Sequence, residues 1–181
     1  MVWKSSSQTQ HRASNNSQTP RARTSTMTTF EQLSQFLTSQ AIVFRTVHHE
    51  ATLTSEASAQ ARGEDLSVGG KAIVMKVDAE FKLFVLSAAL RIDSQKIRSH
   101  FNAKKTRFAS AEELQQLTGL APGSIPPFGK PILNLELFVD QSIARNEIIA
   151  FNAGSLTDSV IMSTKDYLRI AEPAILEFSQ T

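Results

Sequence analysis

Gly119-Leu120-Ala121-Pro122-Gly123-Ser124-Ile125-Pro126-Pro127-Phe128-Gly129 contains three glycines and three prolines within eleven residues. Proline fixes φ and has no N–H, whereas glycine permits a positive φ and lets the backbone approach a ligand closely. The segment therefore cannot be a helix or a central strand. We expect a rigid loop between two regular elements, which presents main-chain groups rather than side chains.

Regular elements are predicted on both sides of this loop. Apolar residues recur at helical spacing over residues 30–37, and Thr29 is placed to cap that helix. Ser110 and Glu113 match a capping box at the start of another helix, and Thr164 is placed to cap a last amphipathic one. Further helices are expected at residues 54–61 and 94–100, and strands at 41–47, 72–77, 81–86, 132–139, 147–152 and 159–162.

The order of these elements bears on fold class and domain organisation. Helices and strands are interspersed without the regular alternation of a doubly wound parallel sheet. We expect an α+β domain at residues 28–181, with a mixed, largely antiparallel central sheet and flanking helices. Residues 1–27 are mainly Ser, Thr, Gln and Asn, which predicts a disordered tail. It is an extension before a start at Met27, a native tail or, ranked third because it has no clear apolar face, an organellar presequence.

Charge and composition exclude several classes of protein. The 181 residues carry a net charge of +2, but residues 1–27 contribute +4 and the remainder has 15 basic and 17 acidic side chains. This body lacks the basic excess of a general nucleic-acid binder, so we expect no DNA binding and RNA contact at one end of the substrate. No apolar run approaches the roughly 20 residues of a membrane span, and we expect a soluble, cytoplasmic protein without a membrane partner.

Metal and thiol chemistry are also disfavoured. The chain has no cysteine, which excludes disulfides, thiolate catalysis and thiolate metal sites and fits a reducing compartment. With only four histidines besides, we expect neither a metal ion nor a cofactor. There is no Gly-x-Ser-x-Gly elbow, P-loop or dinucleotide fingerprint, so a covalent nucleophile is unsupported.

Few single residues stand out as candidates for chemistry. Lys71 follows two glycines at the start of an apolar strand. It is either an ordinary lysine at a strand end or a cation at the mouth of a pocket, where a phosphate or a developing oxyanion would sit. Strand alternation places His48 and His49 on opposite faces, and His49 is a candidate for a pocket role. Asp158 lies in a polar turn that enters a strand, where a solvated carboxylate is the ordinary interpretation.

Four segments, taken in order and spacing, resemble the YbaK/EbsC/ProX family of free-standing aminoacyl-tRNA deacylases, which is related to the editing insertion of bacterial prolyl-tRNA synthetases. They are residues 49–57, Lys71 with the strand it opens, the loop 119–129 as the most specific member, and residues 152–168 with Asp158. The resemblance covers about residues 30–178. Residues 48–51 lack the proline common in the family, and residues 156–158 differ from members with a histidine or threonine-rich sequence there, which bears on the amino acid accepted.

The resemblance implies hydrolysis of the ester that joins a wrong amino acid to the 3′ end of a tRNA, usually the proline tRNA. Because this ester is labile, positioning a water and stabilising the oxyanion should suffice. Lys71 would anchor the terminal phosphate or the ester carbonyl, and Asp158 or a substrate hydroxyl would orient the water. Phe128 would set the size limit of the pocket, unless it is an ordinary core residue. The substrate-binding positions implied are His49, Gly119, Gly123, Ser124, Ile125, Pro127, Phe128, Gly129, Gly154 and Thr157.

Two other functions remain open. A non-catalytic module of the same fold would bind a synthetase or a tRNA end without hydrolysis, and a different hydrolase would act on another small acyl ester. The expected partners are the 3′ end of aminoacyl-tRNA and a prolyl-tRNA synthetase or another translation component, because the near-neutral body suggests weak tRNA affinity. Alanine, serine, threonine and cysteine all remain possible as the amino acid removed.

Overall fold

The structure is a computed structural model that describes residues 27–180, so nearly all of the predicted tail lies outside the described residues. Its helices are α1 (Thr29–Ser39), α2 (Ser55–Arg62), α3 (Ser94–His100), α4 (Ala111–Thr118), α5 (Gln141–Ala144) and α6 (Thr164–Ala171), with a short 3-10 turn at Leu66–Val68. Its strands are β1 (Phe44–His48), β2 (Gly70–Val77), β3 (Glu80–Ser87), β4 (Arg91–Ile92), β5 (Thr106–Phe108), β6 (Glu136–Asp140), β7 (Ile148–Asn152), β8 (Asp158–Ser163), β9 (Ala174–Leu176) and β10 (Ser179–Gln180).

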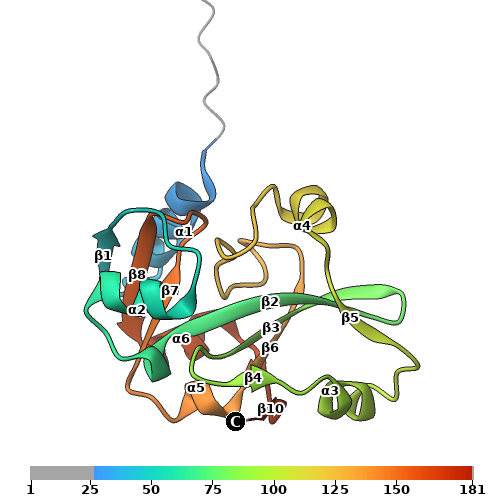
Figure 1. Ribbon diagram of the computed structural model, residues 1–181. Coiled ribbons are helices and arrows are strands. Elements are labelled where there is room, and N and C mark those ends of the chain that lie inside the picture. The colour runs from blue at the N-terminus through green and yellow to red at the C-terminus, as the bar shows by residue number, and fades with distance from the viewer. Residues whose placement is uncertain (1–26, 181) are drawn as a thin grey trace, which may run out of the picture.

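The strands form a five-stranded sheet in the order β5-β2-β3-β6-β9, a three-stranded sheet β1-β8-β7 and a small pair β10-β4 (Figure 1). The long hairpin β2–β3 is antiparallel, as is β5 on β2, whereas β6 and β9 add in parallel. The predicted α+β class with a mixed central sheet and flanking helices is therefore confirmed. The two larger sheets meet at a single parallel bridge between Gly69 and Ala150.

Two hydrophobic cores hold the sheets and helices together. The larger core joins α1, through Leu33 and Leu37, to residues of both larger sheets and to the loop after α4. The smaller core lies where α3 contributes Ile97 and the C-terminal segment contributes Phe178. Burial of this apolar surface is the main favourable term for folding. Because the larger core includes both sheets, it fixes their relative position.

Several local predictions are confirmed and others are corrected. The capping box of Ser110 and Glu113 is present at α4. Thr28, not Thr29, caps α1, because its hydroxyl accepts from the N–H of Glu31 while the Glu31 carboxylate accepts from the N–H of Thr28. In the same way Ser163, rather than its neighbour, caps α6.

Two predicted strands begin later than expected. The first starts at Phe44 because Ala41 takes a φ of 53° in the turn that follows α1. The strand predicted from residue 132 starts at Glu136, because the amides of Ile132 and Leu133 donate to the carbonyl of Gly129 in a turn. Within residues 27–180 no helix has the length and apolar character needed to cross a membrane.

Candidate active site

A pocket of about 270 Å³ opens where the two larger sheets meet. Its walls come from the start of α2 and the residues before it, the first half of β2, the loop after α4 and the end of β7 (Figure 1). The residues that line it are Thr52, Leu53, Thr54, Ser55, Ser58, Arg62, Gly69, Gly70, Lys71, Ala72, Ile73, Ala88, Gly123, Ile125 and Asn152. The predicted site residues Lys71, Gly123 and Ile125 are thus brought together from distant parts of the sequence.

Lys71 is half-buried at the start of β2, and its ammonium donates to the carbonyl of Leu90 at 2.6 Å. Burial lowers the pKa of Lys71. The negative charge of nearby Glu56 raises this pKa in part, and the positive charge of Arg91 lowers it further. The ammonium has three N–H donors, and the described residues use one of them. The side chain is therefore placed to donate to an anionic group that enters the pocket.

Arg62 is a second cation of the pocket, which the sequence analysis missed. Its guanidinium is buried and donates to the Ser159 hydroxyl at 2.9 Å, to the Asn152 side-chain oxygen at 2.6 Å and to the Ala150 carbonyl at 3.3 Å. Burial lowers the pKa of Arg62 to about 10, so the group remains charged at neutral pH. Among residues 27–180 no carboxylate forms an ion pair with it.

A buried cation without a counter-ion is costly, and its charge is available to attract an anion. Helix α2 adds to this potential, because its N-terminus, capped by Thr54, opens onto the pocket. The lining contains two cations, several hydroxyl groups and an amide, but neither a carboxylate nor an imidazole. Such a site can bind an anion or stabilise an oxyanion.

The backbone of β2 contributes to the pocket as well. Strand β5 pairs only with Met75–Val77, and the amide of Ala109 donates to the carbonyl of Val74, which lies on the same edge. Backbone groups of alternate residues point to the same edge, so the N–H and carbonyl of Ala72 face the part of this edge that β5 leaves uncovered. Since Ala72 lines the pocket, a ligand there meets an open strand edge.

The loop 119–129 divides into a part at the pocket and a part in the core. Gly123 has a φ of 86° at the pocket rim, and the Asn152 amide donates to its carbonyl at 2.7 Å. Gly119 instead ends α4 in the left-handed conformation. Gly129 packs so closely that an added Cβ would lie 2.7 Å from the Leu135 carbonyl oxygen.

Three more predicted residues of this loop are structural. Phe128 is fully buried against Phe151 and Tyr167, with ring centroids 5.7 and 5.2 Å away, so the prediction that it sets the pocket's size limit is wrong. The Pro127 carbonyl accepts from the Tyr167 hydroxyl at 2.7 Å. Ser124 is buried, and its carbonyl accepts from the amide of Gly154. The core alternative for Phe128 therefore holds.

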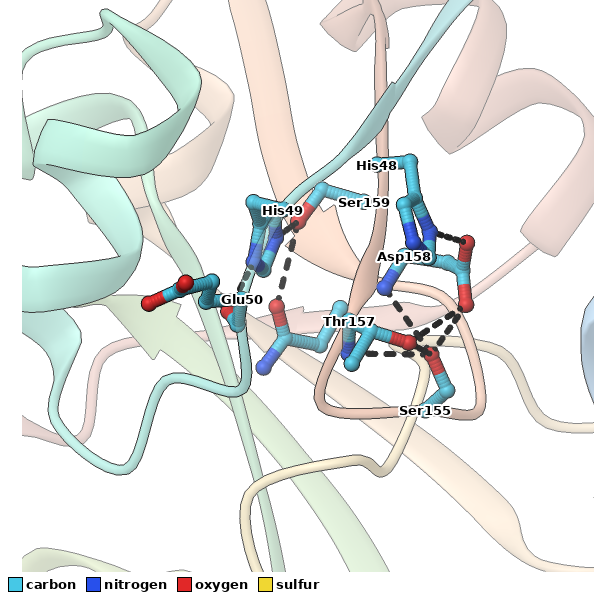
Figure 2. A network of polar contacts seen from close by, with 8 residues as sticks. His48, His49, Glu50, Ser155, Thr157, Asp158 and Ser159 are labelled. Atoms are coloured by element: carbon cyan, nitrogen blue, oxygen red, sulfur yellow. Dashed lines mark hydrogen bonds and ion pairs between the residues drawn. The ribbon is translucent and has the colours of Figure 1, made fainter.

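His49 does not line the pocket but contacts Ser159, which in turn contacts the pocket residue Arg62. Its Nε2 lies 2.9 Å from the Ser159 hydroxyl oxygen, which also accepts from Arg62, and its Nδ1 lies 2.7 Å from the Glu50 carbonyl oxygen (Figure 2). His48 points to the other side of β1, as strand alternation predicts. His49 thus contacts the pocket through Ser159 and not directly.

Asp158 lies outside the pocket, which corrects its expected place beside the substrate. One carboxylate oxygen is 2.8 Å from Nδ1 of His48, and the other accepts from the hydroxyls of Ser155 at 2.6 Å and Thr157 at 2.9 Å (Figure 2). Partial burial raises the pKa of Asp158, but the hydrogen bonds from Ser155, His48 and Thr157 outweigh it and lower that pKa. The carboxylate is occupied in holding the turn.

This turn, residues 154–158, supports a wall of the pocket. The carbonyl of Thr157 accepts from the amide of His49 at 2.9 Å, and that of Leu156 accepts from the amide of Thr52 at 3.2 Å. Gly154 has a φ of 86°, and an added Cβ would lie 2.6 Å from the Cβ of Thr29. Thr157 and Leu156 therefore support the segment 49–52, whereas Gly154 packs on Thr29 and donates its amide to the Ser124 carbonyl. No cluster of potential metal ligands is found in the described part of the chain.

Comparisons with known proteins agree with this geometry. Residues 49–170 match the model of the aminoacyl-tRNA editing domain. The chain is 39% identical over 159 residues to the multifunctional Ser/Thr-tRNA deacylase ProXp-y of Escherichia coli strain K12, covering 84% of this chain and 94% of that protein. It is also 34% identical over 100 residues to the proline–tRNA ligase of Shouchella clausii, covering 55% of this chain and 17% of that longer protein.

The fold itself is shared with solved structures. A candidate trans-editing enzyme for prolyl tRNA synthetase superimposes with a TM-score of 0.75 at 22% identity, and the match covers 87% of this chain and all of that one. The family match spans α2, β2, the loop after α4 and β7, which are the elements that build the pocket. The resemblance found in the four sequence segments is thus confirmed, and the chain belongs to the aminoacyl-tRNA editing domain family.

Proposed function

We propose that this protein is a free-standing deacylase that hydrolyses the ester between a small wrong amino acid and the 3′ end of a tRNA. The observation that carries the proposal is the pocket itself, with Lys71 and Arg62 as cations and no acid among its lining residues. The ester end of a tRNA brings negative phosphate charge, and its hydrolysis passes through an oxyanion. Both features match a positively charged pocket, and the deacylase relative supports the same reaction.

The mechanism rests on positioning. The tRNA end enters with its ester beside Lys71 and the open edge at Ala72, and water attacks the carbonyl carbon. The carbonyl oxygen becomes an oxyanion, which the Lys71 ammonium stabilises. Collapse of this intermediate breaks the bond between the acyl carbon and the ribose oxygen. That oxygen takes up the proton that the attacking water loses, so the products are the free amino acid and the tRNA hydroxyl. With Asp158 held in its turn, the neighbouring ribose hydroxyl of the substrate is left to orient the water.

We further propose that serine and threonine are the amino acids removed. Hydroxyls of Thr52 and Ser58, 2.8 Å apart, lie in the lining with Ser55 and the Asn152 amide. A site that hydrogen-bonds a substrate hydroxyl discriminates strongly against analogues without it. The name of the Escherichia coli relative, a Ser/Thr-tRNA deacylase, supports this choice over alanine and cysteine.

The proline tRNA is the first candidate for the RNA, because proline–tRNA ligases carry a related segment. A prolyl-tRNA synthetase or another translation component would be the partner that delivers it. The cytoplasm, where bacterial translation takes place, is the proposed location, in line with the bacterial relatives.

The decisive test charges proline tRNA separately with alanine, serine, threonine, cysteine and proline and measures the hydrolysis of each. Wild-type protein should remove serine and threonine and spare proline. Lys71→Ala should lower kcat/KM by about 1,000-fold, since one lost oxyanion donor costs about 100- to 1,000-fold and the phosphate contact is lost with it. The variant should have the same melting temperature as wild type, because the Lys71 ammonium that it lacks makes one hydrogen bond to the described residues, with the Leu90 carbonyl.

Each alternative has its own result in this experiment. Folded wild-type protein that binds the charged tRNAs without hydrolysing any would establish the binding module. Turnover of simple acyl esters alone would establish a different hydrolase. Full activity in Lys71→Ala would remove this lysine from the mechanism even if the protein proves to be a deacylase.

A further inference from the structure

Basic side chains gather at the end of the central sheet farthest from the pocket. Residues 91–107 contain six lysines and arginines and a single acid, although the body as a whole is slightly acidic. Five cations surround one surface depression of about 420 Å³, and we call them the basic patch: Lys76, Arg98, Lys104, Lys105 and Arg107. With the carboxylates of Asp78 and Glu113, which lie among them, the region keeps a net charge of +3.

Most of this charge is not used by the fold. Arg98, Lys104 and Lys105 are exposed and take no part in the ion pairs of residues 27–180. The Asp78 carboxylate accepts from the backbone amides of Lys104 and Lys105, both at 2.9 Å, and leaves their ammonium groups free to bind elsewhere. Among the patch cations, Arg107 is the one that a carboxylate of the described residues holds, that of Glu113 at 2.7 Å.

The basic patch and the pocket lie along the same edge of one strand. Lys71 begins β2 at the pocket, whereas Lys76 lies opposite Arg107 where β5 covers that edge. Figure 1 shows α2 near one end of the β2–β3 hairpin and α3 with β5 toward the other. Five residues at about 3.3 Å each separate the two positions by about 17 Å along β2, and strand alternation turns the two lysine side chains to opposite faces of the sheet.

An exposed aromatic side chain lies between the two sites. Phe108, paired with Met75, is 54% exposed at the end of β5. Aromatic side chains beside lysine and arginine are typical of surfaces that hold single-stranded nucleic acid, because bases stack on them while cations contact the phosphates.

We propose that the basic patch docks the phosphate backbone of the tRNA acceptor stem while the charged 3′ end lies in the pocket. This inference rests on the proposed function and adds a second contact region to it. It also accounts for the charge distribution, because the patch region carries +3 while the rest of residues 28–181 carries a net charge of −5. The partner is recognised by its regularly spaced phosphates, so the contact carries affinity rather than sequence specificity.

The test compares a long and a short substrate. Wild type and the variant Arg98→Gln/Lys104→Gln/Lys105→Gln are assayed on full-length tRNA charged with serine and on serine esterified to a CCA trinucleotide, which cannot reach the patch. Lys130→Gln/Arg145→Gln/Lys165→Gln, three exposed cations outside the patch, is the matched control. Binding of uncharged tRNA is measured in parallel from 50 to 200 mM salt.

The patch variant should lose about 10- to 100-fold in kcat/KM on full-length tRNA, mainly through KM, and its log affinity should depend less steeply on log salt by about 0.7 to 0.9 per contact removed. Its rate on the trinucleotide should equal that of wild type, and the control should lose much less. Equal losses in both triple variants, unchanged tRNA binding, or a matching loss on the trinucleotide would each overturn the docking role. If wild type hydrolyses neither substrate, the proposed function fails, and the binding measurement still decides the role of the patch.

Discussion

The pocket around Lys71 and the turn around Asp158 both hold polar side chains that the sequence marks as candidates, but they differ in how those groups are used. Lys71 donates one of its N–H groups to the Leu90 carbonyl, and the buried Arg62 has no carboxylate partner within residues 27–180. Both oxygens of the Asp158 carboxylate are occupied by His48, Ser155 and Thr157.

The cations of the pocket therefore remain available to bind a ligand, whereas the Asp158 carboxylate is fully engaged in hydrogen bonds within the protein. A buried or half-buried charge without its counter-ion destabilises the protein unless a ligand provides the missing charge. A carboxylate that accepts several hydrogen bonds is stabilised in place and has little capacity left for water. The pocket should therefore respond to substitution mainly in activity and the turn mainly in stability.

After Lys71→Ala, the largest effect is expected from filling the pocket rim. Gly123→Val places a branched side chain beside Leu156, whose Cδ2 would lie 3.3 Å from the new Cβ, and should lower kcat/KM by about 100-fold by displacing the bound ester. Gly119→Val is the matched control, because Gly119 also has a positive φ but an added Cβ meets nothing within 4 Å. Both variants should lose about 1–2 kcal/mol of stability. Equal activity losses in the two would remove the pocket role of Gly123.

A smaller loss is expected from the buried cation. Arg62→Met removes the donors to Asn152 and Ala150 and should cost about 1–3 kcal/mol of unfolding free energy through acceptors left unsatisfied. It should also raise KM, because one of the two positive charges of the pocket is lost. Arg62→Lys keeps the charge but not the planar fork, so it should recover KM more fully than stability. Kinetics and thermal unfolding of both variants check this, and wild-type kinetics in Arg62→Met would show that Arg62 is purely structural.

The smallest change in activity is expected at the turn. Asp158→Asn should leave kcat/KM close to wild type and lower stability at neutral pH by about 1 kcal/mol, as hydrogen bonds to a charged acceptor are weakened. Because the folded-state pKa of Asp158 is lowered, its contribution is present above the unfolded value of about 3.9 and is lost as pH falls below it. Urea unfolding at pH 7 and pH 3 should therefore show a gap between the proteins that closes in acid. A large loss of kcat with an altered pH–rate profile would instead restore the direct role for Asp158.

Much of the fold could be predicted from sequence because local signals and tertiary structure agree. The Ser110 capping box, the hairpin and the glycine- and proline-rich loop each depend on residues close together in the chain. The strand predicted from residue 132 failed because apolar residues there pack into the core from a turn, and periodicity cannot distinguish the two.

The site was predictable only where family resemblance supplied long-range information. Lys71, Gly123 and Ile125 line one pocket in the structure, but nothing local separates them from Phe128, which lies in the core. The role of Arg62 in the pocket could not be predicted from sequence, because a basic residue in the last turn of a short helix is common. Its role depends on Asn152 and Ser159, about 90 or more residues away, and only the folded chain brings them together.

The antiparallel pairing of β1 with β8 has a consequence for how the protein is made. Strand β1 is synthesised early, but its partner follows more than a hundred residues later, and the Arg62 contacts on β7 and β8 appear equally late. A growing chain on the ribosome thus carries the pocket wall at Thr52 before Leu156, whose carbonyl accepts from the Thr52 amide, has been made. The protein should therefore be inactive during translation until β7 and β8 have been made and packed against β1 and Arg62.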